Sequence, residues 1–158
     1  MTTIAIVQAR TSSSRLPEKV LLPIGDKPMI LYQLERLRRC RALDGLVLAT
    51  SDHSSDDTLA DLVKNAGFLV FRGDLHDVLH RYKACATQEK ASIVVRLTGD
   101  CPLSDPVLID ELVEAFAQGD WDYLANCADD KQLSVPDGFD VEVFKFSDFR
   151  WIRELGIS

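Results

Sequence analysis

Four short apolar runs recur along this chain, and each is followed by a segment whose apolar residues repeat with helical spacing. The runs cover residues 4–7, 46–50, 68–71 and 93–97. Apolar runs of this length suit strands that are buried on both faces. Because strands that alternate with helices form parallel sheets, we expect an α/β fold with a mostly parallel sheet and helices on both of its faces.

The segments between the runs predict the remaining elements. Ser54 or Ser55 can cap the second helix, and Gly67 can end it. Shorter runs at 123–125 and 141–144 predict two late strands, and the alternation in the second leaves antiparallel pairing open. The expected helices carry apolar residues between positions 29 and 39, 59 and 63, 75 and 82, and 105 and 116.

Length and composition limit the classes of protein that this chain can belong to. With 158 residues, 46% hydrophobic and 27% charged, we expect one soluble globular domain over residues 1–158. No apolar run approaches the ~20 residues that span a bilayer, so no membrane partner is expected. The net charge of −7 argues against a broad nucleic-acid surface.

The four cysteines and the N-terminus point to a compartment. Cys40, Cys85, Cys101 and Cys127 are scattered, with no Cys-x-x-Cys pair. Isolated thiols are typical of a reduced protein rather than of a disulfide framework. No basic segment followed by an apolar one stands at the N-terminus, so no signal peptide is expected. We therefore expect a cytoplasmic location.

A basic loop after the first apolar run is the first candidate site. Residues 8–19 read QARTSSSRLPEK, with Arg10, Arg15 and Lys19 among small side chains. Consecutive backbone N–H groups can form a concavity for an anion, and cationic side chains bind phosphate oxygens. Loops at the carboxyl ends of parallel strands are also where open α/β sheets bind ligands. A polyphosphate cradle and an ordinary polar loop both remain open, since the loop matches neither common glycine-rich motif.

A second candidate follows the fourth apolar run. The segment 98–103 reads TGDCPL and leaves the same edge of a parallel sheet as the basic loop. Mg²⁺ usually binds through one or two carboxylates together with substrate phosphates, and Asp100 can supply a carboxylate there. The alternative is that Asp100 only ends the strand and orders the turn at Pro102.

Three segments in order resemble the SpsF-type cytidylyltransferases, named for spore coat polysaccharide protein F. They are residues 7–21, RLTGDCPL at 96–103 and PDGFDVEVF at 136–144. This group is similar to the CMP-Kdo synthetases and the acylneuraminate cytidylyltransferases, and the resemblance runs from Thr3 to Trp151. It implies a nucleotide-diphospho-sugar transferase-like fold, a Rossmann-like three-layer αβα sandwich. It also implies transfer of CMP from CTP to a sugar acid with release of pyrophosphate, for surface polysaccharide or glycoconjugate biosynthesis.

The resemblance implies roles for individual residues. Arg10, Arg15 and Lys19 would contact the triphosphate, and Asp100 would hold Mg²⁺, the expected cofactor. Arg15, Lys19 and Asp100 would form the catalytic set. The expected nucleotide-binding set also contains Ala9, Ser13, Ser14 and Thr98.

The sugar acid, the second expected partner beside CTP, would meet a further group of polar residues. Arg72 and Asp74 follow the third apolar run, and a turn with Asp74 as a helix cap is an equal alternative. The acidic residues around Gly138 could bind sugar hydroxyls or a metal, or simply form a polar turn. The candidate sugar-binding residues are Arg72, Asp74, Asn126, Asp137, Asp140 and Glu142.

Three other features of the sequence have simpler explanations. Arg96 lies within an apolar run, so we expect it to pair with an acid in the core, with a role in ligand binding as the lesser alternative. His76 and His80 stand one helical turn apart, but no clear third ligand accompanies them for a zinc site. Cys101 has no histidine placed beside it, so a buried structural thiol is expected rather than a nucleophile.

Two alternatives to the cytidylyltransferase belong to other classes. A catalytically silent nucleotide- or sugar-binding module is one, because Ser12 and Glu18 stand where the family commonly has glycine. A glycosyltransferase of related fold is the other, although the Asp-x-Asp metal motif is missing from residues 99–102. The family pattern continues beyond residue 158, which implies a chain without the family's C-terminal part, its second metal-binding aspartate and much of its dimer contact. A homodimer is therefore allowed but not required.

Overall fold

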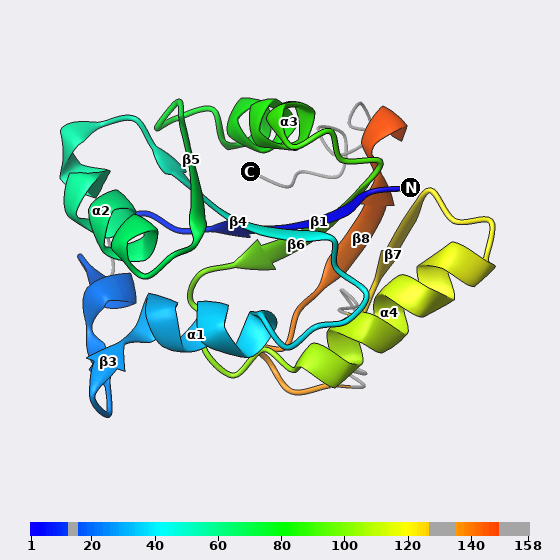
Figure 1. Ribbon diagram of the computed structural model, residues 1–158, viewed down its shortest axis with the longest axis horizontal. Helices are drawn as coiled ribbons and strands as arrows, with labels where there is room; N and C mark the ends of the chain where they lie inside the picture. Colours follow the sequence, from blue (N-terminus) through cyan, green and yellow to red (C-terminus); the bar gives the residue numbers. More distant parts are fainter. Residues whose placement is uncertain (13–15, 127–134, 149–158) are drawn as a thin grey trace.

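The computed structural model describes residues 1–12, 16–126 and 135–148, and a six-stranded sheet forms its centre (Figure 1). The strand order is β5-β4-β1-β6-β8-β7. The first four pair in parallel, and β8 runs antiparallel to both β6 and β7. The strands are β1 (Thr3–Gln8), β4 (Gly45–Ser51), β5 (Leu69–Gly73), β6 (Ile93–Thr98), β7 (Tyr123–Ala125) and β8 (Glu142–Lys145).

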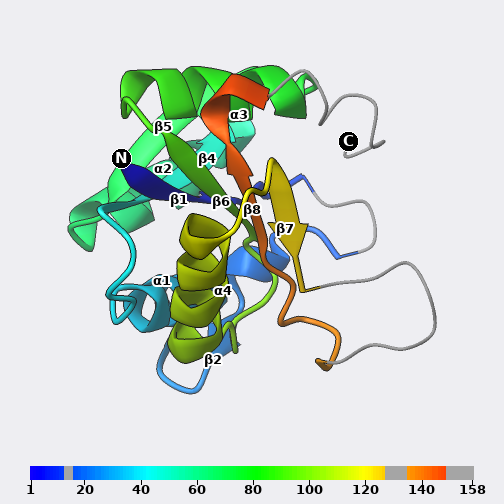
Figure 2. The same cartoon turned by 90° about the vertical axis from the view of Figure 1, so that its right-hand side faces the viewer.

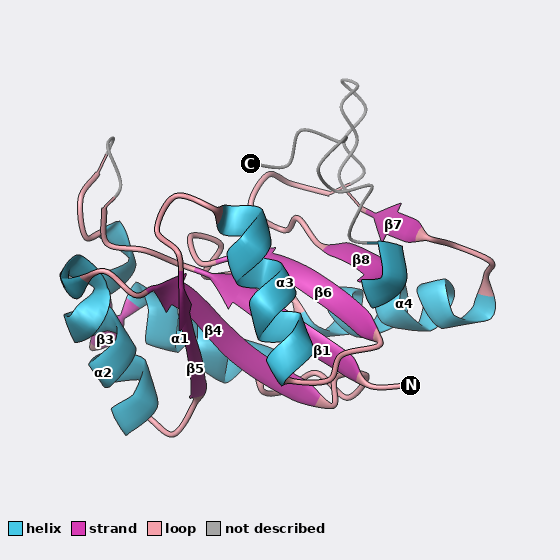
Figure 3. Cartoon of the chain, turned by 90° about the horizontal axis from the view of Figure 1, so that it is seen from above, coloured by secondary structure: helices cyan, strands magenta, loops and turns pink. Residues whose placement is uncertain are grey.

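Helices cover both faces of this sheet, so the expected three-layer αβα sandwich is confirmed. On one face lie α1 (Met29–Leu37), α2 (Asp57–Asn65) and α4 (Pro106–Gln118), and α3 (Val78–Gln88) packs on the other (Figures 2 and 3). The first face holds the larger core, to which α1 contributes Ile30, Leu34 and Leu37, as its periodicity predicts. None of the helices in the described ranges is long and apolar enough to cross a bilayer.

The strand register brings the carboxyl ends of the parallel strands to one edge. In β1, Gln8 lies opposite Ala49 of β4 on one side and Thr98 of β6 on the other. The loops that follow β1 and β6 are therefore neighbours in space. This is the convergence that the two candidate segments require.

Two helix starts differ from the sequence-based expectations. A short 3₁₀ helix, η2 (Ser54–Asp56), precedes α2, and Asp56 rather than a serine occupies the N-cap position of α2. Helix α3 begins at Val78 rather than near residue 75, because the carboxylate of Asp77 accepts a hydrogen bond from the backbone of His80 and caps the helix there. Gly67 ends α2 with a positive φ of 79°, as expected.

A short hairpin and two further 3₁₀ turns complete the described chain. The strands β2 (Pro23–Ile24) and β3 (Lys27–Pro28) pair antiparallel around a turn at Gly25. One 3₁₀ turn, η1 (Lys19–Leu21), connects the basic loop to this hairpin. The other, η3 (Phe146–Asp148), follows β8.

Candidate nucleotide-binding site

The loops after β1 and β6 touch at the carboxyl edge of the sheet because residue 99 is a glycine. The backbone N–H of Gly99 donates a hydrogen bond of 2.7 Å to the carbonyl of Gln8. A Cβ added at Gly99 would lie 2.6 Å from the Cβ of Ala9 and 2.8 Å from that carbonyl oxygen. Both atoms belong to the neighbouring strand end and its backbone, so glycine is what permits the close approach.

This approach places a basic and an acidic side chain of the two candidate segments together. The ammonium of Lys19 lies 2.6 Å from a carboxylate oxygen of Asp100. Both side chains remain partly exposed, at 28% and 40% respectively, so a ligand can reach them. Burial would raise the pKa of the Asp100 carboxyl, but the hydrogen bonds from Lys19 and Thr98 outweigh it and hold the pKa below its ordinary value.

The basic loop is closed at its base by backbone hydrogen bonds. The carbonyl of Thr11 accepts a bond of 2.8 Å from the N–H of Glu18, and Glu18 adopts a left-handed conformation with φ 57°. Arg10 is exposed beside this closure, whereas Ala9 is buried and its N–H donates to the carbonyl of Ala49. The predicted residues Ser13, Ser14 and Arg15 lie outside the described residues.

An acidic group lies on the β8 side of Asp100. Burial raises the pKa of the Asp140 carboxyl, and the charges of Asp137, Glu142 and Asp100 raise it further. The charged form of Asp140 is therefore disfavoured by these neighbouring negative charges. Within the described ranges, however, no three carboxylate, histidine or cysteine side chains converge as a ready-made metal cage. A cation at Asp100 would need oxygen ligands from a bound phosphate, which is the usual arrangement for Mg²⁺.

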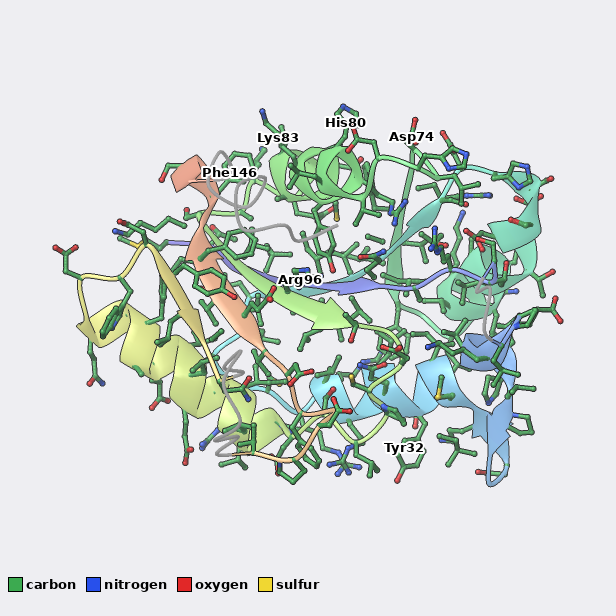
Figure 4. The ribbon with its side chains drawn as sticks, turned by 180° about the vertical axis from the view of Figure 1, so that it is seen from behind. Tyr32, Asp74, His80, Lys83, Arg96 and Phe146 are labelled. Atoms are coloured by element: carbon green, nitrogen blue, oxygen red, sulfur yellow. The ribbon has the colours of Figure 1, made fainter. Side chains whose placement is uncertain are left out.

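Two of the proposed sugar-binding residues have partners within the protein. The carboxylate of Glu142 lies 2.5 Å from the guanidinium of Arg96, so the expected core acid of Arg96 is identified. Figure 4 labels Arg96 on the central sheet. The side-chain amide of Asn126 donates to the carbonyl of Phe139, and its oxygen accepts from the N–H of Val141. Asn126 thus holds the segment that carries Asp140.

Arg72 and Asp74 are also tied to their surroundings. Arg72 forms an ion pair of 2.7 Å with Asp57 and donates to the carbonyls of Ser51 and His53. The carboxylate of Asp74 accepts hydrogen bonds from the two backbone N–H groups of His76 and Asp77, so Asp74 forms the expected polar turn. It is not the helix cap, because Asp77 takes the N-cap position of α3. These contacts order the turn between β5 and α3.

The side chains of Cys101 and Thr98 complete the β6 end of the site. Burial raises the pKa of the Cys101 thiol, and its sulfur lies 3.2 Å from the hydroxyl of Thr98. A thiol that is hard to ionise is a poor nucleophile, which agrees with a structural role. Gln33 of α1 is fully buried and donates to the carbonyl of Thr98 at 2.8 Å, which fixes the end of β6.

Three buried residues that support the site were missed by sequence reasoning. They are Gln33, Asp56, which bonds to Thr11 of the basic loop, and Arg81, which donates to the carbonyl of Asp74. Gln33 and Asp56 leave no local pattern, because they contact segments 65 and 45 positions away in the sequence. Arg81 instead contacts a carbonyl only seven positions before it. Only the burial of a polar residue between apolar positions of a helix could have indicated Gln33 and Arg81.

Comparison with known proteins shows the family of this chain. A sequence profile of the family described as Cytidylyltransferase matches residues 4–136. The chain belongs to the cytidylyltransferase family. It is 42% identical to the spore coat polysaccharide biosynthesis protein SpsF of Bacillus subtilis over 127 residues, which are 77% of this chain and 53% of that protein. The resemblance inferred from the three sequence segments is therefore confirmed.

Solved structures show the same fold. A cytidylyltransferase from Leptospira borgpetersenii is 35% identical and superposes with a TM-score of 0.89 over 98% of this chain and 64% of that one. A CMP:2-keto-3-deoxy-manno-octonic acid synthetase complexed with CTP superposes with a TM-score of 0.78 at 18% identity, over 98% of this chain and 78% of that one. The chain spans about half the length of the curated cytidylyltransferases that it matches.

Proposed function

We propose that this cytidylyltransferase domain binds CTP at the carboxyl edge between β1 and β6 and transfers CMP to a sugar acid. The observation that carries the proposal is the 2.6 Å contact between Lys19 and Asp100, which joins the basic loop to the β6 carboxylate. A triphosphate needs cationic side chains, and a metal bound with it needs a carboxylate oxygen. Both are present at one accessible point of the sheet edge.

The reaction would be an in-line displacement at the α-phosphorus of CTP. A sugar hydroxyl forms the new oxygen–phosphorus bond, the bond to the bridging α–β oxygen breaks, and pyrophosphate leaves with that oxygen while the hydroxyl proton passes to solvent. Such transfers depend mostly on positioning and on charge stabilisation. Lys19 and Arg10, with Arg15, Ser13 and Ser14, would bind the phosphates and stabilise the charge on pyrophosphate.

Asp100 is the residue that would hold Mg²⁺ in this proposal. The ion supplies positive charge to the phosphate oxygens when it is bound. Asp100 fits this role because its carboxylate is partly exposed and its lowered pKa keeps it ionised at neutral pH. A relative of this fold from Mycobacterium tuberculosis, Rv0371c, has been solved in complex with manganese, and its chain superposes with a TM-score of 0.67.

The sugar acid would approach from the β8 side of the edge. The carboxylates of Asp137 and Asp140 would accept hydrogen bonds from sugar hydroxyls there. Burial raises the pKa of Asp140 and the charges of Asp137 and Asp100 raise it further, which supports grouping these acids. The internal contacts of Arg72, Asp74, Asn126 and Glu142 favour a supporting role, in which they order the segments that line this side.

We also propose that the protein is located in the cytoplasm. Cys40, Cys85 and Cys101 are free thiols in the described part of the chain, which suits a reducing compartment. A homodimer, which the family resemblance allows, would appear in light scattering as twice the mass of one chain.

Thermal shift with nucleotides tests the proposal. We expect CTP with Mg²⁺ to raise the melting temperature more than ATP, GTP or UTP does, because the chain belongs to the cytidylyltransferase family. A ligand at 100 times its dissociation constant adds about 2.7 kcal/mol of stability, which a thermal shift can detect. Pyrophosphate release with CTP, Mg²⁺ and a panel of sugar acids then measures turnover. Equal shifts with all four nucleotides would contradict cytidine specificity, and binding without turnover would favour a silent nucleotide-binding module.

A further inference from the structure

The carboxylate of Asp56 is fully buried beside the basic loop, with an exposure of 0%. Its Oδ1 accepts a hydrogen bond of 2.7 Å from the backbone N–H of Thr11 and lies 2.7 Å from the hydroxyl of the same residue. That hydroxyl also reaches the carbonyl of Ser55 at 2.9 Å. The other oxygen, Oδ2, accepts from the N–H and the hydroxyl of Ser51 at the end of β4.

These bonds connect a rigid strand end to the base of the loop. Thr11 is held to Asp56 through its N–H, and its carbonyl accepts the N–H of Glu18 at 2.8 Å. Glu18 directly precedes Lys19, whose ammonium lies 2.6 Å from Asp100. A continuous series of short polar contacts therefore runs from β4 through the loop to the β6 carboxylate.

The position of Asp56 in its own helix shows that its carboxylate faces the loop. Asp56 is the N-cap residue of α2, where an aspartate usually accepts a hydrogen bond from the first turn. Its side chain makes no such capping bond. Both carboxylate oxygens of Asp56 accept hydrogen bonds from Thr11 and Ser51 instead of from the first turn of α2.

The carboxylate is charged in this buried place. Burial would raise the pKa of the Asp56 carboxyl, but the hydrogen bonds from Ser51 and Thr11 outweigh it and hold the pKa below its ordinary value. A buried carboxylate with several donors is strongly tied to them, because each unpaired donor or charge would be costly. Asparagine has only one side-chain oxygen, so it could not replace both carboxylate oxygens of Asp56. Its amide N–H₂ group would face the N–H of either Thr11 or Ser51, which is also a donor.

We propose that Asp56 is a positioning residue that fixes the basic loop for binding the triphosphate. It touches no substrate atom, and it acts through Thr11 on the placement of Arg10 and Lys19. The inference rests on the proposed function for the identity of the ligand. The hydrogen bonds of Asp56 to the loop do not depend on any ligand. The anchoring role and the proposed function can therefore be tested separately.

The test compares Asp56→Asn with Asp110→Asn. Asp110 of α4 is a matched control, because its buried carboxylate accepts the backbone N–H groups of Arg41 and Ala42 far from the loop. We expect Asp56→Asn to weaken CTP binding about tenfold or more relative to CMP, the scale of one lost charged hydrogen bond. In Asp110→Asn the affinity ratio of CTP to CMP should stay unchanged, even if unfolding becomes easier.

Amide hydrogen exchange supplies a readout that needs no nucleotide. The amides of Thr11 and Glu18 should exchange faster in Asp56→Asn than in the parent protein and at the parental rate in Asp110→Asn. If the parent protein binds neither CTP nor CMP, the proposed function fails, while these two amides still decide whether Asp56 anchors the loop. Parental exchange in Asp56→Asn, or equal losses of CTP and CMP affinity, would overturn the inference.

A second pair of variants covers the case in which Asp56→Asn does not fold. Thr11→Val removes the hydroxyl that reaches Asp56, and Thr11→Ser keeps it. We expect Thr11→Val to lower the affinity ratio of CTP to CMP and to speed exchange at Glu18, with Thr11→Ser restoring both. Identical behaviour of the two variants in both measurements would count against the anchoring role.

Discussion

The ammonium of Lys19 lies 2.6 Å from the carboxylate of Asp100, although 81 positions of sequence separate them. The contact joins the two segments that the sequence marks as candidate sites. Each charge is balanced by the other at a point that solvent can reach. A bound triphosphate and its metal would supply each with a separate partner, a phosphate for Lys19 and a cation for Asp100.

Removing the ammonium of Lys19 should weaken nucleotide binding far more than folding. For Lys19→Ala we expect CTP affinity to fall by about 1.5–3 kcal/mol, the scale of a hydrogen bond to a charged group. The free energy of unfolding should change by less than about 1 kcal/mol, because partly exposed ion pairs contribute little. Titration calorimetry and urea unfolding measure the two quantities.

Lys27→Ala is the control for that experiment. Lys27 forms a similarly exposed ion pair of 2.7 Å with Glu35 at the β2–β3 hairpin. Its loss should leave CTP affinity unchanged. Unaltered affinity in Lys19→Ala as well would place the triphosphate elsewhere on the protein.

Adding a methyl group at Gly99 should destabilise the protein. The new Cβ would lie 2.6 Å from the Cβ of Ala9 and 2.8 Å from the carbonyl of Gln8, so two strand ends must separate. We expect Gly99→Ala to cost about 1–3 kcal/mol, the usual range for overpacking. In Gly45→Ala the Cβ meets only the terminal methyl of Ile4, which can move, so the loss should be smaller. Equal stability of the two variants by urea unfolding would refute the close approach.

Removing the charge of Asp140 should stabilise the protein in a pH-dependent way, because burial and the charges of Asp137, Glu142 and Asp100 disfavour it. The pKa of Asp140 is raised in the folded state, so ionisation of this group costs folding free energy. That cost is absent below the ordinary pKa of 3.8 and is complete above the raised one. At pH 7 the melting temperature of Asp140→Asn should therefore be higher than that of the parent protein. At about pH 3 the two melting temperatures should be equal.

The control for Asp140 is an acid outside the cluster. Asp61→Asn changes the same charge on the exposed side of α2, so its effect on the melting temperature at pH 7 should be smaller. A lower melting temperature for Asp140→Asn at pH 7 would show that its carboxylate is attracted rather than repelled by its surroundings.

The ion pair between Arg96 and Glu142 should be costly to break from one side. The two side chains are only 18% and 12% exposed, so Arg96→Met would leave an uncompensated carboxylate between β6 and β8. We expect a loss of about 3 kcal/mol, the lower end for a broken buried pair. The double variant Arg96→Met with Glu142→Met should recover part of it in urea unfolding. A double variant less stable than either single one would contradict this account.

The layers and the order of the elements could be predicted from the sequence because they depend on local patterns. A run such as 4–7 is apolar on both sides and too short for a buried helix, so it forms an interior strand. The periodicity of Ile30, Leu34 and Leu37 defines the buried face of α1 in the same way. The family resemblance also rests on ordered local segments, which is why the comparisons confirm it.

Helix starts were less predictable because several residues near each start compete for the cap. Ser54, Ser55 and Asp56 can all cap a helix, and their order alone does not decide among them. The tertiary structure decides it, since Asp56 takes the N-cap position while its carboxylate bonds to Thr11 and Ser51. Similarly, Asp74 and Asp77 order a turn before α3, where the apolar periodicity alone predicts helix.

The chain by itself determined which kinds of side chain reach the sheet edge: basic after β1, acidic after β6. Parallel strands bring their carboxyl ends together, so the meeting of the two segments followed from the fold class. Only the tertiary structure decided the particular pairs, Lys19 with Asp100 and Thr11 with Asp56. Each pair joins segments more than 40 positions apart, and its distance depends on the packing of Gly99 against Ala9 and on the register of the strands, neither of which leaves a local pattern.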